Sequence, residues 1–325
     1  MVKEILVNGY RWVRNICWML VVKKSEEKKF HNIYEKKLKP YSKEKYYVIS
    51  CENMPQQGLF GYVGLMLAMI RYAYEHNMIP IIDMKNYPNT YLEDYEVGKI
   101  NAWELFFQQV CNNTIEDVYK DCTYVMGNHM DIDWYNMPNI GGYHRKSSYF
   151  LWSNLYDRFV KLSDQAQMYC DEEFQELLEG KEKETLGLLI RGTDIKTCKG
   201  HALQPSIQQV ISKVEKVLKK HKTYKYIYLA TEEYANEKIL RDYFPDMIIV
   251  NKRTYYDNIN YEQGLSNVKM DKKKSIRGME YLSSINLLSK CDSLLAGQCG
   301  GSFAAYYMNG GKYRYCYFWE LGIVK

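Results

Sequence analysis

The residues with the clearest chemical potential follow a short apolar run, Leu186–Ile190, which ends at Arg191-Gly192-Thr193-Asp194. Such a run is typical of a buried strand, and open α/β sheets bind ligands at the carboxyl ends of their strands. An arginine at that place can bind phosphate bidentately and neutralise a departing diphosphate. Asp194 can orient the arginine or accept hydrogen bonds from a sugar or base. The alternative is a structural Arg–Asp pair in a turn.

Polar residues further along extend this candidate site for an anionic ligand, most simply a nucleotide diphosphate. His201 and Gln204, in the following loop, are candidates to line a base or ribose pocket, although a lone loop histidine is more often structural. Thr231, Glu232 and Glu233 end a second predicted strand, where carboxylates suit guanine donors or ribose hydroxyls. The alternative is a helix start, with Thr231 as N-cap and acidic residues in the first turn.

Two later segments place charges or bare amides near helix starts. Arg277, followed by Glu280, opens a predicted helix and is a second candidate for a phosphate or base contact. Gly300, Gly301 and Ser302 lie between a predicted strand and helix, where backbone amides can cradle a phosphate. A tight turn explains the glycines equally well.

The remaining motifs are weak or missing. Gly58 and Gly61 lie at the entry to a helical segment and are candidates for a loop on the acceptor side. The chain has no Gly-x-x-x-x-Gly-Lys-Ser/Thr phosphate loop and no His-Glu-x-x-His motif. Its nine cysteines are scattered without a Cys-x-x-Cys pair. We therefore expect no metal, no cofactor beyond a donor substrate, no disulfide framework and a reducing compartment.

The net charge of +5 is concentrated at the N-terminus, where residues 1–45 carry 12 Lys or Arg against 5 Glu. The rest of the chain is close to neutral and has no recognised nucleic-acid motif, so we expect no nucleic-acid partner. The apolar run within this extension is too short to span a bilayer. Either the extension packs on the body as a helix, or it lies as an interfacial helix on an anionic membrane leaflet. We expect a cytoplasmic protein, peripheral on the inner face of the cell membrane in the second case.

Strand and helix patterns alternate in both halves of the chain. In the first half, a strand at 46–51, a helix at 61–77 and a strand at 78–84 form a βαβ pattern. Residues 85–150 are predicted as loops and short helices, and 151–178 as helical. The second half contains predicted strands at 185–190, 224–230, 247–250 and 293–296, and predicted helices at 206–221, 235–244, 278–290 and 303–308.

This alternation predicts an α/β protein with two doubly wound, Rossmann-like domains. The predicted division is an extension at 1–45, an N-terminal domain at 46–180 and a C-terminal domain at 181–325.

Taken in order, the motifs resemble the GDP-fucose-dependent fucosyltransferase superfamily, which includes α1,6-, nodulation and protein O-fucosyltransferases and bacterial polysaccharide enzymes. The resemblance covers 185–308 and, more loosely, 52–83. The family's arginine before a Thr-Asp pair is similar to Arg191–Asp194, and its Ala-Thr-Asp-Asp is similar to Ala230–Glu233. Its last motif is similar to Arg277-Gly278 and the turn at Gly300–Ser302.

The resemblance implies a GT-B fold, with the donor held by the C-terminal domain and the acceptor by the N-terminal one. It implies an inverting, metal-independent transfer of fucose from GDP-fucose to a hydroxyl of a cell-surface polysaccharide or glycan precursor, such as a lipid-linked oligosaccharide. Arg191 would neutralise the β-phosphate, with Gly300, Gly301 and Ser302 assisting. Glu232 and Glu233 would lie near guanine or ribose.

The chain also departs from the family pattern. Leu189 stands where the α1,6 enzymes have a histidine, and Gly192 replaces their second arginine. Ser284 occupies the place of an acidic residue in the last motif, and Gly300 that of a serine. Two alternatives therefore stay open: a catalytically impaired relative that binds a nucleotide sugar or glycan, and a transferase with another nucleotide-sugar donor.

Overall fold

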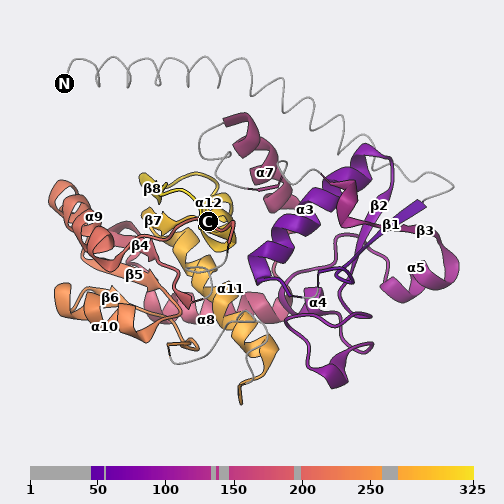
Figure 1. Cartoon of the computed structure of the whole chain (residues 1–325), viewed down its shortest axis with the longest axis horizontal. Helices are drawn as coiled ribbons and strands as arrows, with labels where there is room; N and C mark the ends of the chain where they lie inside the picture. The colour runs from indigo at the N-terminus through magenta and orange to yellow at the C-terminus, as the bar shows by residue number, and fades with distance from the viewer. Residues whose placement is uncertain (1–44, 55, 133–136, 139–145, 194–198, 258–269) are drawn as a thin grey trace.

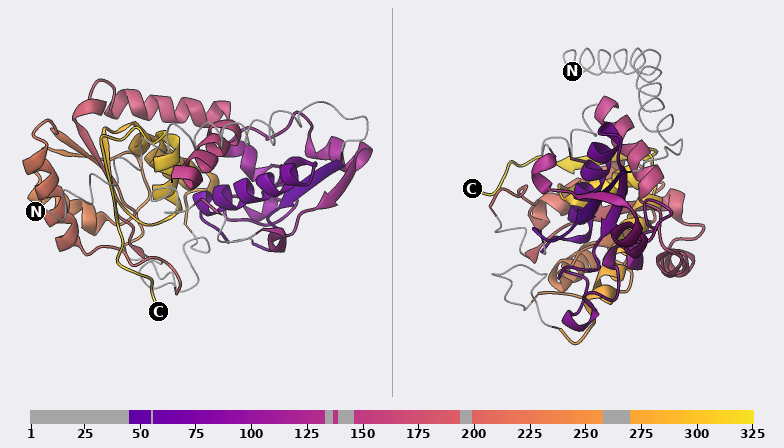
Figure 2. Two further views of the ribbon diagram at one scale, coloured as in Figure 1. Left: turned by 90° about the horizontal axis from the view of Figure 1, so that it is seen from above. Right: turned by 90° about the vertical axis from the view of Figure 1, so that its right-hand side faces the viewer.

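Figure 1 shows the computed structural model of the chain, which describes residues 45–54, 56–132, 137–138, 146–193, 199–257 and 270–325. Within these residues lie two parallel β-sheets, one in each half of the chain. The two halves lie next to each other along the long axis of the molecule (Figures 1 and 2). Residues 1–44 of the predicted extension and Asp194 lie outside the described residues, so the predictions about them stay predictions.

The first sheet has three parallel strands in the order β2-β1-β3. The central strand and β2 are buried along most of their length, which explains their nearly continuous apolar sequences. The helix that connects them starts directly after Gly58 and buries most of its side chains. The elements of this half are β1 (Lys45–Ser50), α3 (Leu59–Glu75), β2 (Ile79–Asp83), η4 (Asp94–Glu96), α4 (Ala102–Phe106), α5 (Ile115–Asp121), β3 (Thr123–Met126) and η5 (His129–Asp131).

The second sheet has five parallel strands in the order β6-β5-β4-β7-β8. Its central strand is fully buried because helices cover both faces. Leu186 and Leu188 pack with the α9 side, whereas Leu189 faces the cluster that includes α11 and α12. The elements from 146 onward are α7 (Lys146–Phe159), α8 (Asp164–Leu177), η7 (Glu182–Glu184), β4 (Thr185–Leu189), α9 (Ile207–Lys220), β5 (Tyr226–Ala230), α10 (Tyr234–Tyr243), β6 (Ile248–Ile249), α11 (Lys274–Lys290), β7 (Ser293–Gly297), α12 (Gly300–Met308) and β8 (Tyr315–Trp319).

Helix α11 connects the two halves physically. It packs against α8, α12, β4 and β5 on one side and against α3 and α4 of the N-terminal half on the other (Figure 1). One continuous cluster of buried apolar side chains accordingly includes Ile49 of β1, Leu67 of α3, Leu288 of α11 and Leu294 of β7. The start of α11 and the carboxyl ends of β4 and β5 are thereby held next to the start of α3.

Most predicted elements are confirmed, with small shifts at their ends. Ser206, predicted as the first residue of a helix, is instead the N-cap of α9, and its side chain accepts a hydrogen bond from the Gln209 amide. Two strands were missed: β3, within the segment predicted as loops and short helices, and β8 near the C-terminus. β3 is short and mostly exposed, and its apolar residues Tyr124, Val125 and Met126 do not stand out within a segment rich in Tyr, Asn and Asp.

The assignment of Thr231 as an N-cap is wrong. Helix α10 begins at Tyr234, directly after Glu233. Neither the Thr231 nor the Glu233 side chain caps the helix. Instead the Asp257 carboxylate accepts hydrogen bonds from the amides of Tyr234 (2.6 Å) and Ala235 (2.7 Å). The capping group thus comes from a residue distant in sequence.

Candidate active site

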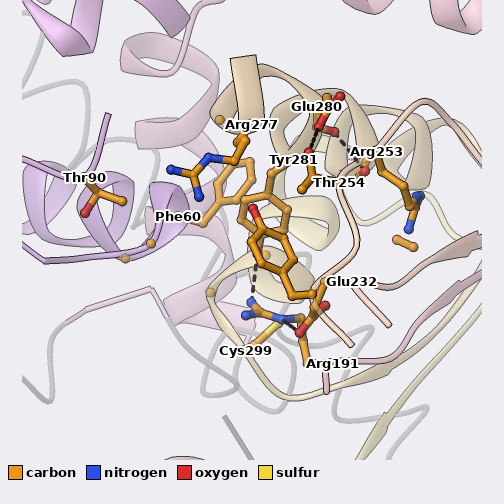
Figure 3. Close-up of a pocket in the computed structure, with 18 of the residues that line it drawn as sticks. Phe60, Thr90, Arg191, Glu232, Arg253, Thr254, Arg277, Glu280, Tyr281 and Cys299 are labelled. Carbon is orange, nitrogen blue, oxygen red and sulfur yellow. Dashed lines mark hydrogen bonds and ion pairs between the residues drawn. The ribbon is translucent and has the colours of Figure 1, made fainter. Parts of the chain in front are cut away.

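A cavity of about 530 Å³ lies where the carboxyl ends of β4 and β5 meet the start of α3 (Figure 3). Its walls come from both halves of the chain: the N-terminal parts of α11 and α12 lie on one side, and the residues before and at the start of α3 lie on the other. In parallel α/β sheets this edge is the expected place for a ligand. From the N-terminal half the lining residues are Gln56, Gln57, Gly58, Phe60, Gly61, Thr90 and Tyr91.

Arg191 lies at the end of β4 and is held by two side chains on this wall. Its Nε donates to Glu232 Oε1 at 2.7 Å, and its Nη1 donates to the Tyr281 hydroxyl at 3.4 Å (Figure 3). Its guanidinium also lies 5.7 Å from the centre of the Tyr281 ring. Burial lowers the pKa of Arg191, but the Glu232 carboxylate, together with Tyr281 and Cys299, outweighs burial and keeps this pKa well above its ordinary value. The side chain is therefore a fixed, permanently charged cation at the cavity.

Glu232 organises the whole turn after β4. Besides Arg191, its Oε1 accepts hydrogen bonds from the Gly192 amide (2.9 Å) and the Thr193 hydroxyl (3.1 Å). Glu233 adds a hydrogen bond from the Thr193 amide at 2.9 Å. A side chain at Gly192 would overlap the Glu233 carboxylate, at 1.9 Å, which explains why a glycine stands here. The two glutamates thus fix the turn that presents Arg191.

Tyr281 was missed by the sequence analysis, yet it lies in the middle of the cavity wall (Figure 3). Burial raises its pKa well above the ordinary value, and the nearby Arg191 charge only partly opposes this effect, so the hydroxyl stays protonated. A Cβ at Gly301 would lie 2.4 Å from that hydroxyl. Gly301 therefore leaves room for Tyr281, which in turn positions Arg191.

Further charged side chains line the same wall. Arg277 and Lys274 come from the start of α11, and Arg253 from the segment after β6. Burial raises the pKa of Tyr256, while the Arg277 charge beside its hydroxyl works in the opposite direction. Glu280 accepts hydrogen bonds from the Thr254 hydroxyl (2.7 Å) and Lys272 (2.6 Å). With Arg191 and Glu232, the wall carries more cations than carboxylates, so it favours an anionic ligand.

The structure brings most of the predicted site residues together at this cavity. Gly300 is among them, and a Cβ there would lie 3.2 Å from the backbone of Phe60, so the starts of α12 and α3 approach closely. Glycine at this position therefore has a steric reason. The predicted residues that line the cavity are Gly58, Gly61, Arg191, His201, Thr231, Glu232, Arg277, Glu280, Gly300 and Gly301.

Among the described residues, three of the predicted ones do not line the cavity. Gln204 donates to the carbonyls of Ala202 and Gln298, both at 3.0 Å, and so ties two loops together. Glu233 holds the turn after β4, as described above. Ser302 is fully buried, and its hydroxyl forms a capping box with Cys299 at the start of α12. Each of these side chains forms hydrogen bonds within the loops and turns that support the cavity.

Two further features of the described residues bear on the predictions. Among them no group of three or more His, Cys, Asp or Glu side chains is arranged to hold a metal ion. In the same part of the chain, no helix combines the length and the apolarity needed to cross a bilayer.

Comparisons with known proteins identify structures of similar fold. No protein-family model and no curated protein matches the chain. Among solved structures it is similar to POFUT1 in its apo form, with a TM-score of 0.51 and 12% identity over 87% of this chain and 100% of that one. NodZ α-1,6-fucosyltransferase soaked with GDP-fucose gives a TM-score of 0.46 and 11% identity over 82% and 93%. A mutant of Arabidopsis thaliana FUT1 in complex with GDP gives 0.43 and 11% over 90% and 78%. The predicted class, two parallel α/β sheets arranged as in a GT-B protein, is confirmed: this chain shares the fold of the POFUT1 structure.

Proposed function

We propose that this protein is a glycosyltransferase that transfers fucose from GDP-fucose to a hydroxyl of a glycan. The observation that carries the proposal is Arg191, fixed by Glu232 and Tyr281 at the end of a central strand and facing a cavity. The proposal gains support from the likeness in fold to POFUT1, a protein that is also described in complex with GDP-fucose.

The chemistry of the transfer suits this arrangement. The acceptor oxygen attacks the anomeric carbon on the face opposite the diphosphate, and the bond from that carbon to the phosphate oxygen breaks. The electron pair of that bond leaves with GDP, whose developing charge needs a preorganised cation. We assign that task to Arg191, with the amides of Gly300 and Gly301 at the start of α12 assisting.

The acceptor proton needs a base, and the configuration at the anomeric carbon inverts. We propose Asp194 for this role, three residues after Arg191 in the chain. Glu52, a further carboxylate in the N-terminal half, does not line the cavity. We further propose that no metal takes part, because arginines supply the positive charge at the cavity wall.

The division of the cavity suggests which half holds which substrate. We propose that residues 181–325 hold the nucleotide sugar and 46–180 hold the acceptor, a cell-surface polysaccharide or lipid-linked glycan precursor. The lining residues that carry charge all come from the second half. A diphosphate needs cations, whereas sugar hydroxyls are bound well by neutral polar groups.

A ligand panel followed by a transfer assay tests the function. We expect GDP and GDP-fucose to raise the melting temperature more than UDP, UDP-sugars or GDP-mannose, because a ligand that binds only the folded state stabilises it. With GDP-fucose and a glycan acceptor, GDP should then be released together with a fucosylated product. A preference for a UDP-sugar in both assays would show that the donor is that sugar nucleotide and not GDP-fucose. Binding of none of these nucleotides would reject the proposal.

A non-catalytic relative that binds a nucleotide sugar is the second candidate, favoured by Ser284 and Gly300. Ser284 is buried, and its hydroxyl donates to Asn251 Oδ1 at 2.9 Å instead of offering a carboxylate to a ligand. GDP binding without transfer or hydrolysis of GDP-fucose would favour this candidate. Turnover by the purified protein would exclude it.

A further inference from the structure

Arg253 lines the cavity but belongs to no motif identified in the sequence (Figure 3). It lies just after β6 and is half-buried. Its Nε donates to the Asn251 carbonyl at 3.4 Å, its Nη1 to the Thr231 carbonyl and its Nη2 to Asn251 Oδ1. A guanidinium carries five N–H donors, so these three hydrogen bonds to described residues leave two.

The electrostatic state of Arg253 differs from that of Arg191. Glu232 directly neutralises Arg191, at 2.7 Å. The three acceptors of Arg253 are neutral carbonyl oxygens, and no described carboxylate forms an ion pair with it. A partly buried cation held only by neutral groups attracts an anion strongly, because little solvent screens it.

The position of Arg253 is set by a buried polar network centred on Asn251, which is 3% exposed. Asn251 Oδ1 accepts from the hydroxyls of Tyr228 and Ser284, both at 2.9 Å. Its Nδ2 donates to Glu173 Oε2 at 3.1 Å. Since the buried amide has several partners at once, its orientation is fixed, and so is the acceptor that it offers to Arg253.

Glu173 of α8 extends this network to the backbone next to Arg253. This buried carboxylate accepts a hydrogen bond from the Lys252 amide at 3.0 Å and another from the Ser283 hydroxyl. The backbone before Arg253 and the tip of its side chain are thus both anchored. Anchoring of this kind lowers the conformational entropy that a flexible arginine would lose when it binds a ligand.

We propose that Arg253 binds a phosphate oxygen of the nucleoside diphosphate, and that Asn251 and Glu173 are its positioning residues. The strand order places β5 between β4 and β6. Arg191 follows β4, and Arg253 follows β6 and reaches the Thr231 carbonyl at the end of β5. The two arginines therefore follow the strands on either side of β5, and both line the same cavity. This inference rests on the proposed function.

Binding measurements with GDP and guanosine test the role of Arg253. We expect Arg253→Gln to weaken GDP binding about 10-fold to about 100-fold, as loss of a charge-assisted contact does. The affinity for guanosine, measured by competition at millimolar concentration, should change less than about 2-fold because guanosine has no phosphate. The matched control is Lys252→Gln, which removes the same charge from an adjacent side chain that is 73% exposed and does not line the cavity. It should leave both affinities unchanged.

Each result separates the hypotheses. Equal weakening of GDP and guanosine would assign Arg253 to the base and overturn the phosphate contact. An unchanged GDP affinity in the folded variant would overturn the inference alone. A wild-type protein that binds no GDP or other nucleoside diphosphate would instead overturn the proposed function. If Arg253→Gln does not fold, Arg253→Lys is the substitute, and it should weaken GDP binding about 3-fold or more, since lysine loses the planar fork.

A milder variant tests the positioning network. Tyr228→Phe removes one of the hydrogen bonds to Asn251 Oδ1 and leaves the ring packing intact. We expect about a 3-fold loss in GDP affinity with guanosine affinity unchanged. A merely structural network would lower the melting temperature without changing the ratio of the two affinities, and that result would overturn the positioning role.

Discussion

The two walls of the cavity differ in charge. The wall from the C-terminal half carries Arg191, Glu232, Arg253 and Arg277, whereas the lining residues from the N-terminal half are neutral, such as Gln56. Charged groups at a cavity are costly to desolvate unless they are held by hydrogen bonds, and the C-terminal wall has the sheet edge and the buried Asn251 network to hold them. The neutral wall needs no such scaffold. The difference supports our proposal that the anionic donor binds on the charged side and the neutral acceptor on the other.

The strongest test removes the central cation of the charged wall. We expect Arg191→Ala to lower transfer about 100-fold to about 1000-fold, because stabilisation of the leaving diphosphate is lost. The Arg191 and Glu232 side chains are only 16% and 14% exposed, so the variant also leaves a poorly solvated carboxylate. This should lower the free energy of unfolding by about 1–3 kcal/mol, measured by denaturant titration.

Arg241→Ala is the matched control for Arg191→Ala. Arg241 also pairs with a glutamate, Glu237 at 2.8 Å, but its side chain is 47% exposed and does not line the cavity. Transfer by this variant should stay within about 2-fold of wild type, since Arg241 lies outside the cavity and contacts none of the groups that hold Arg191. If both arginine variants lose activity equally, or if Arg191→Ala turns over near-normally, the charged wall has no special role.

A smaller effect is expected where only the position of the cation changes. Gly301→Ala places a methyl group 2.4 Å from the Tyr281 hydroxyl, so Tyr281 must move and Arg191 with it. We expect transfer to fall about 10-fold or more, because a misplacement of about 1 Å is costly in catalysis.

Gly58→Ala provides the comparison on the neutral wall. A Cβ at Gly58 meets nothing within 4 Å, and the residue lines the same cavity. The free energy of unfolding and the transfer rate of the Gly58→Ala variant should both stay close to those of the wild type. Equal losses in the two alanine variants would mean that Tyr281 does not transmit the effect.

A substitution on the neutral wall should weaken binding of the acceptor and leave binding of the nucleotide unchanged. Gln56→Ala removes an exposed amide on that wall, and we expect the acceptor KM to rise about 3-fold to about 10-fold through loss of neutral hydrogen bonds. The GDP affinity, measured by calorimetry on the same preparation, should not change. A weaker GDP affinity with an unchanged acceptor KM would reverse the assignment of the two walls.

How far the sequence predicts this site depends on the kind of contact. Arg191 and Glu232 were found because parallel strands end at one edge, so polar residues directly after apolar runs meet there. Tyr281 was not found, since it is one of 32 tyrosines and lies within a helix whose sequence has no distinguishing pattern. Arg253 was not found because its role depends on Asn251 and Glu173. The hydrogen bond between these two residues joins a loop and a helix that are far apart in the chain.

The same distinction applies to the fold. The helix that starts after Ser206 was predicted and its cap is local in sequence, whereas α10 is capped by Asp257 across a long separation. The short strand β3 pairs in parallel with β1, and its three apolar residues are too few to mark it as a strand by themselves. Long-range partners of this kind leave no signal in the spacing of residues.

The smallest expected effect concerns the support behind the charged wall. Asp257→Ala removes both hydrogen bonds to the first amides of α10, and loss of a cap lowers the free energy of unfolding by about 1 kcal/mol. The melting temperature should fall by about 2 °C, as expected for a chain of this size. Asp257 does not line the cavity, and Glu232 keeps its hydrogen bonds to the turn, so GDP affinity should stay within about 2-fold of wild type. If the affinity falls along with the stability, the charged wall depends on α10 as well as on the sheet edge, and the contrast between the two walls has to include the helix behind one of them.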